Sequence, residues 1–161
     1  MAGSDVPPAW RLRISTDADL EWAFDLHKAA LGDYVEQTWG WDEAVQRQMF
    51  GDAFHRHARQ VIQVAGQDVG VLIVEERVDD LYLGLLELMP LWQNKGLGTD
   101  ILRWLLRRAA DTGRALSLHV LSVNVRAAAL YEREGLRVVG SEQTRLLMRT
   151  EAPQPPRSGP R

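Results

Sequence analysis

The feature that most constrains this chain is a glycine-containing junction at residues 93–98, which read Gln-Asn-Lys-Gly-Leu-Gly. It lies between a strand-like apolar run, residues 81–89, and a helix-like run, residues 99–108. A strand that enters a helix through small residues leaves the first helical N–H groups unpaired, and these groups, with the helix dipole, form a site for a phosphate. Gly96 and Gly98 leave room for an anion to approach the backbone and allow a positive φ. The alternative is an ordinary glycine turn.

Two familiar phosphate loops do not match this junction. A Walker loop places its lysine after the glycine, whereas Lys95 precedes Gly96. A dinucleotide fingerprint requires three spaced glycines, and only two are present here. Lys95 nevertheless stands out, because Lys28 and Lys95 are the only lysines among the 19 basic residues.

A second motif follows the junction along the chain. Asn124, Ala128 and Tyr131 are spaced i, i+4 and i+7, so a helix would present an amide, a gap and a phenol on one face. This face is suited to binding a ligand. Alternatively, Asn124 caps the helix and Tyr131 fills core space with its hydroxyl at the rim.

Together, the two motifs resemble those of the GNAT superfamily of acyl-CoA-dependent N-acetyltransferases. The first has the form Gln/Arg-x-x-Gly-x-Gly after an antiparallel strand. The second has the form Asn-x-x-Ala-x-x-x-Tyr-x-x-x-Gly, which residues 124–135 resemble, give or take one residue in the position of the alanine. The resemblance covers about residues 10–150, and a Tyr-Val-Glu-Gln-x-Trp-Gly-Trp-Asp run from residue 34 is similar to that of a bacterial subset of the family.

This resemblance implies acetyl-CoA as co-substrate, with no metal. Its pyrophosphate would rest on the junction, whose residues are Gln93, Asn94, Lys95, Gly96, Leu97, Gly98 and Thr99. The pantetheine arm would run as an extra strand beside Leu86 and Leu88, and Asn124, Ala128 and Tyr131 would face the same ligand. Tyr131 occupies the position that family members use to protonate the leaving thiolate, and an ordinary phenol is a neutral donor at pH 7.

The hydrophobic pattern predicts an α/β (α+β) fold with a mixed, largely antiparallel sheet and helices on both faces, in the order β-α-α-β-β-β-α-β-α-β-β. Short turns at 66–68 and 79–80 predict an antiparallel meander. A first helix is expected with one face formed by Leu20, Phe24, His27 and Leu31. A second is expected from near Asp42, with its inward side chains being Trp41, Val45, Met49 and Phe50.

The base that deprotonates the amine is open among three candidates. Glu87 is the only carboxylate in residues 81–89, and burial would raise its pKa so that it acts directly or through water. Strand alternation does not settle its face, because a bulge would change the parity, and an outward surface charge is the alternative. Tyr82 stands where some relatives have a catalytic glutamate. His119 is the third candidate, and His27 is interpreted as a core histidine.

The acceptor would lie near residues 33–43, a predicted connection between the two early helices that holds three aromatic and four acidic residues. Aromatic faces with carboxylates suit a cationic amine. Tyr34, Trp39 and Trp41 are therefore substrate-site candidates, together with Tyr82 and His119. The alternative is a helix corner packed by tryptophans.

Composition excludes several other classes. A net charge of −3 and a pI near 5.8 argue against nucleic-acid binding. No apolar run approaches the roughly 20 residues of a membrane span, and the N-terminus does not resemble a secretory signal. The absence of cysteine fits a cytoplasmic protein and excludes a cysteine acyl-enzyme. The short His55-x-His57 pair lacks zinc spacing.

We therefore expect a flexible N-terminus at 1–9, one N-acetyltransferase domain at 10–150 and a disordered, proline-rich tail at 151–161. The expected activity is direct acetyl transfer, in a ternary complex, to a primary amine of a small molecule or peptide. The expected assembly is a monomer or homodimer. The alternatives are a non-catalytic acyl-CoA-binding regulatory module and a nucleotide-phosphate binder.

Overall fold

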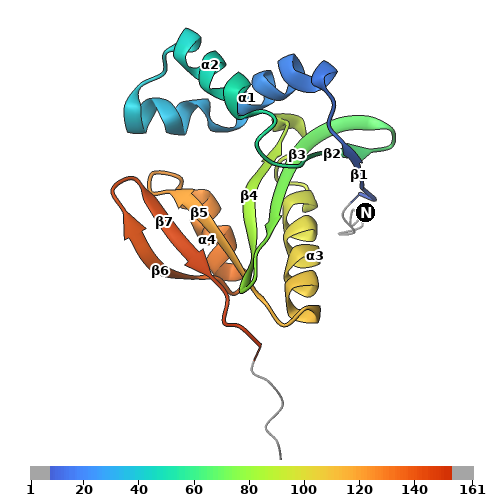
Figure 1. Ribbon diagram of the computed structural model, residues 1–161, viewed down its shortest axis with the longest axis vertical. Helices are drawn as coiled ribbons and strands as arrows, with labels where there is room; N and C mark the ends of the chain where they lie inside the picture. The colour runs from blue at the N-terminus through green and yellow to red at the C-terminus, as the bar shows by residue number, and fades with distance from the viewer. Residues whose placement is uncertain (1–7, 154–161) are drawn as a thin grey trace, which may run out of the picture. The chain divides into compact units, whose positions relative to one another are not determined.

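The computed structural model describes residues 8–153, so most of the predicted flexible N-terminus and disordered tail lies outside the described residues. The elements occur in the predicted order (Figure 1). They are β1 (Arg11–Ile14), η1 (Asp17–Asp19), α1 (Leu20–Trp39), α2 (Glu43–Ala53), β2 (Arg59–Val64), β3 (Gln67–Glu76), β4 (Asp80–Leu88), η2 (Pro90–Trp92), α3 (Leu97–Asp111), β5 (Ala115–Leu121), α4 (Val125–Arg133), β6 (Arg137–Glu142) and β7 (Arg145–Arg149).

The strands form a seven-stranded, mostly antiparallel sheet in the order β1-β2-β3-β4-β5-β7-β6. This confirms the predicted fold class. Two compact units divide the chain: the residues up to Glu75 with Leu83–Asp100, and Glu76–Tyr82 with the residues from Ile101 onward. The prediction of one domain over residues 10–150 stays a prediction.

The sheet of the first unit is built from hairpins. β1 pairs with β2 and β2 with β3, both antiparallel. The β2–β3 turn comes one residue earlier than predicted, because Ala65 and Gly66 both adopt the positive φ, 50° and 78°, that a tight two-residue hairpin requires. Gly70 allows β3 to approach β4, since a Cβ there would lie 2.5 Å from the Glu87 carbonyl oxygen.

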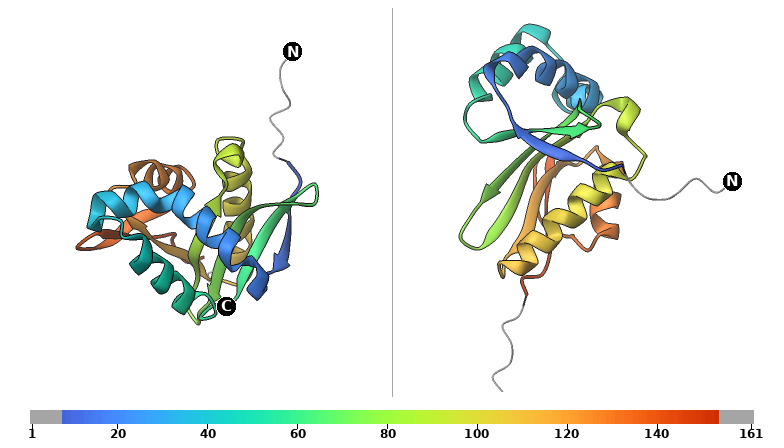
Figure 2. Two further views of the ribbon diagram at one scale, coloured as in Figure 1. Left: turned by 90° about the horizontal axis from the view of Figure 1, so that it is seen from above. Right: turned by 90° about the vertical axis from the view of Figure 1, so that its right-hand side faces the viewer.

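Two antiparallel helices cover one face of this sheet (Figure 2). Arg47 of α2 pairs with Glu21 near the start of α1, and Lys28 farther along α1 pairs with Glu43 at the start of α2. The core beneath them is a cluster of Ala23, Leu26, Phe54 and Val71, against which Trp22, Phe50, Leu85 and Met89 pack.

The sequence prediction was wrong about where α1 ends. Residues 33–39, predicted as a connection, form the second half of α1, which continues to Trp39 and ends at Gly40 with φ 81°. A single helical glycine such as Gly32 costs only about 1 kcal/mol. Burial of Val35, which is 7% exposed, stabilises the turns beyond it.

The predicted inward face of α2 was also wrong in part. The helix begins as expected, because the Asp42 side chain accepts a hydrogen bond from the Val45 N–H at 3.0 Å. Phe50 packs on the core cluster. Val45 and Met49 are exposed, so the helical spacing of the apolar residues in α2 predicted burial correctly for only some of them.

In the second unit, β5 pairs with β7 and β7 with β6, both antiparallel. The buried side chains of this unit include Leu102, Leu105, Leu116, Leu118, Leu136 and Met148. Arg103 of α3 binds the Glu134 carboxylate beyond the end of α4, with Nε 2.9 Å from Oε2. Ser117 of β5 donates a hydrogen bond to Asp80 at the start of β4.

Candidate functional site

The loop before α3 has the geometry of an anion cradle. Asn94 and Gly96 have positive φ values of 59° and 81°, which turn the chain sharply into the helix. The first intrahelical bond runs from the Asp100 N–H to the Gly96 carbonyl, at 3.0 Å. The N–H groups of residues 97–99 therefore precede the hydrogen-bonding pattern of α3 and remain for a ligand.

The side chains of this loop divide into supporting and available groups. Gln93 donates through Nε2 to the Leu88 carbonyl at 3.0 Å, so it ties the loop to the end of β4. Lys95 is exposed, and its Nζ lies 5.3 Å from the centroid of the Trp92 ring, which positions a positive charge at the cradle. The sequence allowed a positive φ at Gly98. In the structure Gly98 does not adopt one and lies in the first turn of α3.

The end of β4 presents alternate residues to opposite sides. Leu85 and Met89 pack on the α1–α2 cluster, whereas a Cβ at Gly98 of α3 would lie 3.6 Å from Leu88 Cδ1. The Met89 N–H donates to the Val69 carbonyl of β3 at 2.8 Å. By alternation, the backbone groups of Leu86 and Leu88 point away from β3, and the Leu88 carbonyl accepts the Gln93 hydrogen bond.

Glu87 lies on the helix-covered face and is buried, with its side chain only 2% exposed. Its Oε2 lies 2.9 Å from Nδ1 of His27 on α1, and the His27 side chain is 20% exposed. The alternative that Glu87 is an outward surface charge is therefore wrong. In a neutral imidazole, a carboxylate that accepts from Nδ1–H fixes the tautomer and leaves the lone pair on Nε2. The pair therefore combines the buried carboxylate of Glu87 with the partly exposed imidazole of His27.

Arg59, at the start of β2, was not recognised from the sequence. Its side chain is buried, and its guanidinium carbon lies 4.7 and 4.5 Å from the ring centroids of Phe50 and Phe54. Burial lowers the pKa of the Arg59 guanidinium, and the negative charge of Glu87 opposes that shift. No local pattern marks Arg59 or pairs His27 with Glu87, because these contacts join distant segments.

In the aromatic and acidic segment, residues 33–43, the Glu43 carboxylate already has hydrogen-bond donors from the chain. Trp41 donates through Nε1 to Glu43 at 2.8 Å, and Lys28 donates to the same carboxylate at 2.9 Å. The Lys28 hydrogen bond is the main cause that lowers the Glu43 pKa. The chain's own lysine thus uses the Glu43 carboxylate that had been considered for a cationic acceptor. Trp39 is exposed and Tyr34 is partly buried in α1.

In the second unit, Asn124 is the N-cap of α4, and its side chain accepts from the Ala127 N–H at 3.2 Å. This confirms the capping alternative and leaves ligand binding as a prediction. Ala128 and Tyr131 lie on α4, both partly exposed. Burial raises the pKa of the Tyr131 phenol, which keeps it protonated at neutral pH.

Tyr82 and His119 also meet within this unit. The Tyr82 hydroxyl lies 2.7 Å from His119 Nδ1, and Glu142 Oε1 lies 3.9 Å from His119 Nε2. The guanidinium carbon of Arg77 lies 3.9 Å from the Tyr82 ring centroid. The structure therefore brings two of the predicted substrate-site residues together, in a polar row that leads to the exposed Glu142.

Among residues 8–153, no group of His, Cys, Asp and Glu side chains is arranged to hold a metal ion. No helix there has both the length and the apolar character needed to traverse a bilayer.

Comparison with known proteins agrees with the fold. The model of the acetyltransferase (GNAT) family matches residues 21–136, so the chain belongs to that family. No curated protein sequence matches it significantly.

Similar solved structures include the PaiA N-acetyltransferase of Thermoplasma acidophilum in complex with coenzyme A, at 13% identity and a TM-score of 0.71, covering 89% of this chain and 99% of that one. An acetyltransferase of Thermus thermophilus has 18% identity and a TM-score of 0.69, with 89% and 98% covered. A GNAT family acetyltransferase of Elizabethkingia anophelis with acetyl-CoA bound has 12% identity and a TM-score of 0.63, with 88% and 97% covered.

Proposed function

We propose that this protein is an acetyl-CoA-dependent N-acetyltransferase that acts on a primary amine of a small molecule or peptide. The observation that carries the proposal is the cradle before α3, with positive φ at Asn94 and Gly96 and with the N–H groups of residues 97–99 preceding the first helical hydrogen bond. Two structurally similar acetyltransferases hold coenzyme A or acetyl-CoA, which supports the same donor here.

In this proposal the cradle binds the pyrophosphate, with Lys95 adding charge. Leu86 and Leu88 pair with the pantetheine arm through their backbone groups. A backbone N–H in this stretch of β4 polarises the acetyl carbonyl, which is a single-donor oxyanion site. Asn124 and Ala128 line the ligand from α4, with Tyr131 near the sulfur.

Proton movement is assigned to two sets of residues. His27 Nε2 removes the proton from the incoming ammonium, and Glu87 holds the His27 tautomer and balances the charge that develops on the ring. The free amine attacks the carbonyl, so a C–N bond forms and the C–S bond breaks. Tyr131 donates its phenolic proton to the departing thiolate, and the attacking nitrogen, which becomes positively charged on attack, then loses its extra proton and restores the Tyr131 phenol. The chain has no cysteine, so transfer through a cysteine acyl-enzyme is excluded and direct transfer remains.

The acceptor side is assigned to Tyr34, Trp39, Trp41, Tyr82 and His119. Of these, Tyr82 and His119 offer a polar pair and Trp39 an exposed aromatic face. We further propose that the enzyme acts in the cytoplasm as a monomer or homodimer, without a metal.

The deciding experiment measures free CoA thiol released from acetyl-CoA in the presence of a panel of amines: polyamines, amino acids and peptides with free N-termini. The proposal expects at least one amine to accelerate thiol release above the rate with acetyl-CoA alone. Tight binding of acetyl-CoA with no acceleration by any amine class would instead support a non-catalytic acyl-CoA-binding module. Mass spectrometry of the product would identify the acetylated nitrogen.

A further inference from the structure

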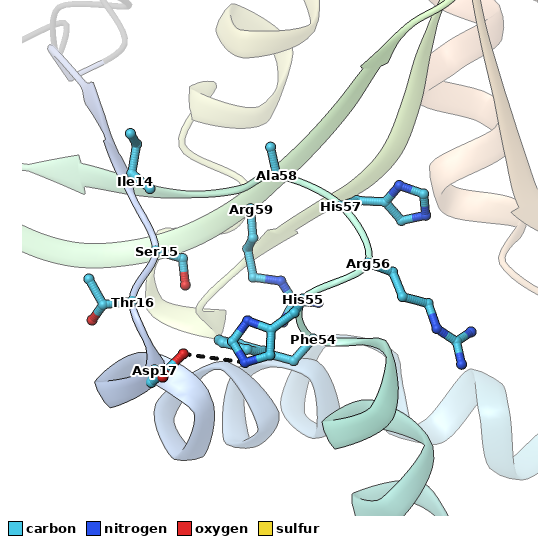
Figure 3. A pocket seen from close by; sticks show the side chains of 10 residues that line it. All are labelled: Ile14, Ser15, Thr16, Asp17, Phe54, His55, Arg56, His57, Ala58 and Arg59. Carbon is cyan, nitrogen blue, oxygen red and sulfur yellow. Dashed lines mark ion pairs between the residues drawn. The ribbon is translucent and has the colours of Figure 1, made fainter.

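The first unit encloses a second buried charge besides Glu87, the guanidinium of Arg59. Arg59 begins β2 and lines the small pocket drawn in Figure 3, where its side chain extends toward Phe54. The residue is only 8% exposed, and its Nε and Nη1 atoms are buried without a hydrogen-bond partner. Nothing in the proposed acetyl transfer uses this buried cation.

The register of the sheet places Arg59 on the same face as Glu87. Val61 of β2 pairs with Val71 of β3, and Val71 belongs to the core cluster beneath α1 and α2. Arg59 precedes Val61 by two residues, so strand alternation directs both side chains to that helix-covered face. Glu87 of β4 faces the same helices, where its carboxylate binds His27 of α1. The guanidinium and the carboxylate therefore share the space between the sheet and the two helices.

The Phe50 ring of α2 links Arg59 to the Glu87–His27 pair. Its centroid lies 4.7 Å from the guanidinium carbon of Arg59 and 5.3 Å from the centroid of the His27 ring. Arg59 and His27 thus contact the same aromatic side chain. Because both groups pack on one ring, the position of the guanidinium relative to the pair is fixed.

The charges of Arg59 and Glu87 act on each other through this enclosed region. Burial lowers the pKa of the Arg59 guanidinium, and the negative charge of Glu87 opposes that shift. Charges interact more strongly in a protein interior than in water, because the effective dielectric constant is lower. The reciprocal effect is that the positive charge of Arg59 favours the ionised carboxylate and opposes the addition of a proton to the Glu87–His27 pair.

Other charged side chains on the neighbouring elements have partners of their own near the surface. These ion pairs are Lys28 with Glu43, Arg47 with Glu21 and His57 with Glu75. Their side chains are all at least 26% exposed, against 2% for Glu87, so solvent and salt screen them. Arg59 acts on the pair without such screening, because it is buried with it.

We propose that Arg59 is a positioning residue of the acetyl transfer: its buried positive charge keeps Glu87 ionised and leaves His27 able to accept the proton of the incoming ammonium. This inference rests on the proposed function, because it gives Arg59 a role through the Glu87–His27 pair and not through contact with a substrate.

The first test is the pH profile of kcat in the wild type and in Arg59→Met. Without the positive charge the pair binds a proton more readily, so the acid limb of the profile should move to higher pH by about one unit. Arg59→Lys keeps the charge and should leave the limb close to that of the wild type. Arg56→Met, an exposed position three residues earlier, makes the same charge change as Arg59→Met and should not move the limb. A limb that stays in place in Arg59→Met, or moves equally far in Arg59→Lys, overturns the proposal.

A second test does not depend on turnover, so it separates this inference from the proposed function. Urea denaturation at pH 7 compares the effect of Arg59→Met in the wild type with its effect in Glu87→Gln. If the two charges act on each other, Arg59→Met should lower the urea midpoint by about 0.5 M less in Glu87→Gln than in the wild type. Equal effects would show that Arg59 only packs against the phenylalanine rings, and would overturn the proposal.

The double variant also decides if Arg59→Met alone does not fold. Recovered folding in Arg59→Met with Glu87→Gln supports the coupling, and continued failure to fold overturns it. Coupled charges in a protein for which no amine accelerates CoA release would instead count against the proposed function.

Discussion

At the scale of single residues, the most informative pair is Glu87 with His27. A carboxylate that is 2% exposed cannot exchange protons directly with an acceptor in solution, whereas an imidazole that is 20% exposed can. The sequence made Glu87, without His27, a candidate for the role of base. The hydrogen bond between the two side chains indicates that Glu87 and His27 share this role. In the proposed mechanism, Glu87 is a positioning residue and His27 is the group that meets the substrate.

Glu87→Gln should lower kcat about 100-fold and leave the KM for acetyl-CoA unchanged, because the amide cannot balance a positive charge on His27. Steady-state kinetics would check this, with the exposed Glu21→Gln as the matched control.

The two positions should also be coupled. His27→Ala alone should reduce kcat about as much as the double variant, since residues that act as a unit are not additive. Additive losses would contradict the pairing.

Tyr131→Phe should lower turnover with little change in acetyl-CoA affinity. Burial raises the Tyr131 pKa, so the phenol stays protonated from neutral pH to above its ordinary value of about 10. Single-turnover kinetics and direct binding by calorimetry separate the two effects. Unchanged turnover would remove Tyr131 as the acid.

At the scale of elements, both ends of α3 use a glycine with positive φ. Gly96 precedes the first turn with φ 81°, and Gly113 follows the last with φ 68°. Only the first lies where the N–H groups point outward. The two glycines are therefore conformationally matched, and they differ in what surrounds them.

Gly96→Asp should abolish CoA binding, because aspartate tolerates positive φ but places a negative charge against the pyrophosphate. Gly113→Asp is the matched control and should bind CoA as the wild type does. Equilibrium binding of CoA to both variants is the measurement. Retained binding in Gly96→Asp would show that the cradle is wrongly assigned.

The junction of β1 with η1 has a charge cluster that sets a pH dependence. Arg13 contacts Asp19 and Asp68, each at 2.8 Å, and its hydrogen bonds to Asp19 are the main cause that lowers the Asp19 pKa to about 2. Because the folded-state pKa lies below the unfolded value of about 3.9, the stabilisation is present above pH 4 and is lost as the pH falls toward 2.

Asp19→Asn should therefore reduce the free energy of unfolding by about 1–2 kcal/mol at pH 6, a range that allows for solvent screening. The difference from the wild type should shrink below pH 4. Urea denaturation at pH 6 and at pH 3 would measure it, with Asp111→Asn at the end of α3 as a control. A difference that does not change with pH would contradict the linkage.

At the scale of the whole molecule, acetyl-CoA should stabilise the folded chain. At 100 times its Kd it adds about 2.7 kcal/mol, which corresponds to a rise in Tm of about 5–10 °C for a chain of this length. ATP at the same concentration should give a smaller shift, because it lacks the pantetheine arm that we propose pairs with β4. Thermal unfolding with each ligand tests this, and equal shifts would assign the loop to nucleotides in general.

Much of this organisation was readable from the sequence. The order of elements, the cap at Asn124 and the turn into α3 follow from local rules: apolar period, capping chemistry and glycine placement. The errors also have local causes. α1 continued past Gly32 because burial of Val35 outweighed the helix penalty of one glycine, and Val45 and Met49 of α2 stayed exposed despite their helical spacing.

The sequence by itself determined the family, the fold class and the residues that form the cradle, because each depends on contacts between near neighbours in the chain. Tertiary structure alone decided that Glu87 is buried against His27, 60 residues earlier, and that Arg59 lies enclosed without a hydrogen-bond partner for Nε and Nη1. Such pairings depend on which face a strand presents and which helix covers it. A shift of one residue in the register of a strand turns its side chains to the opposite face, and local periodicity does not fix the register.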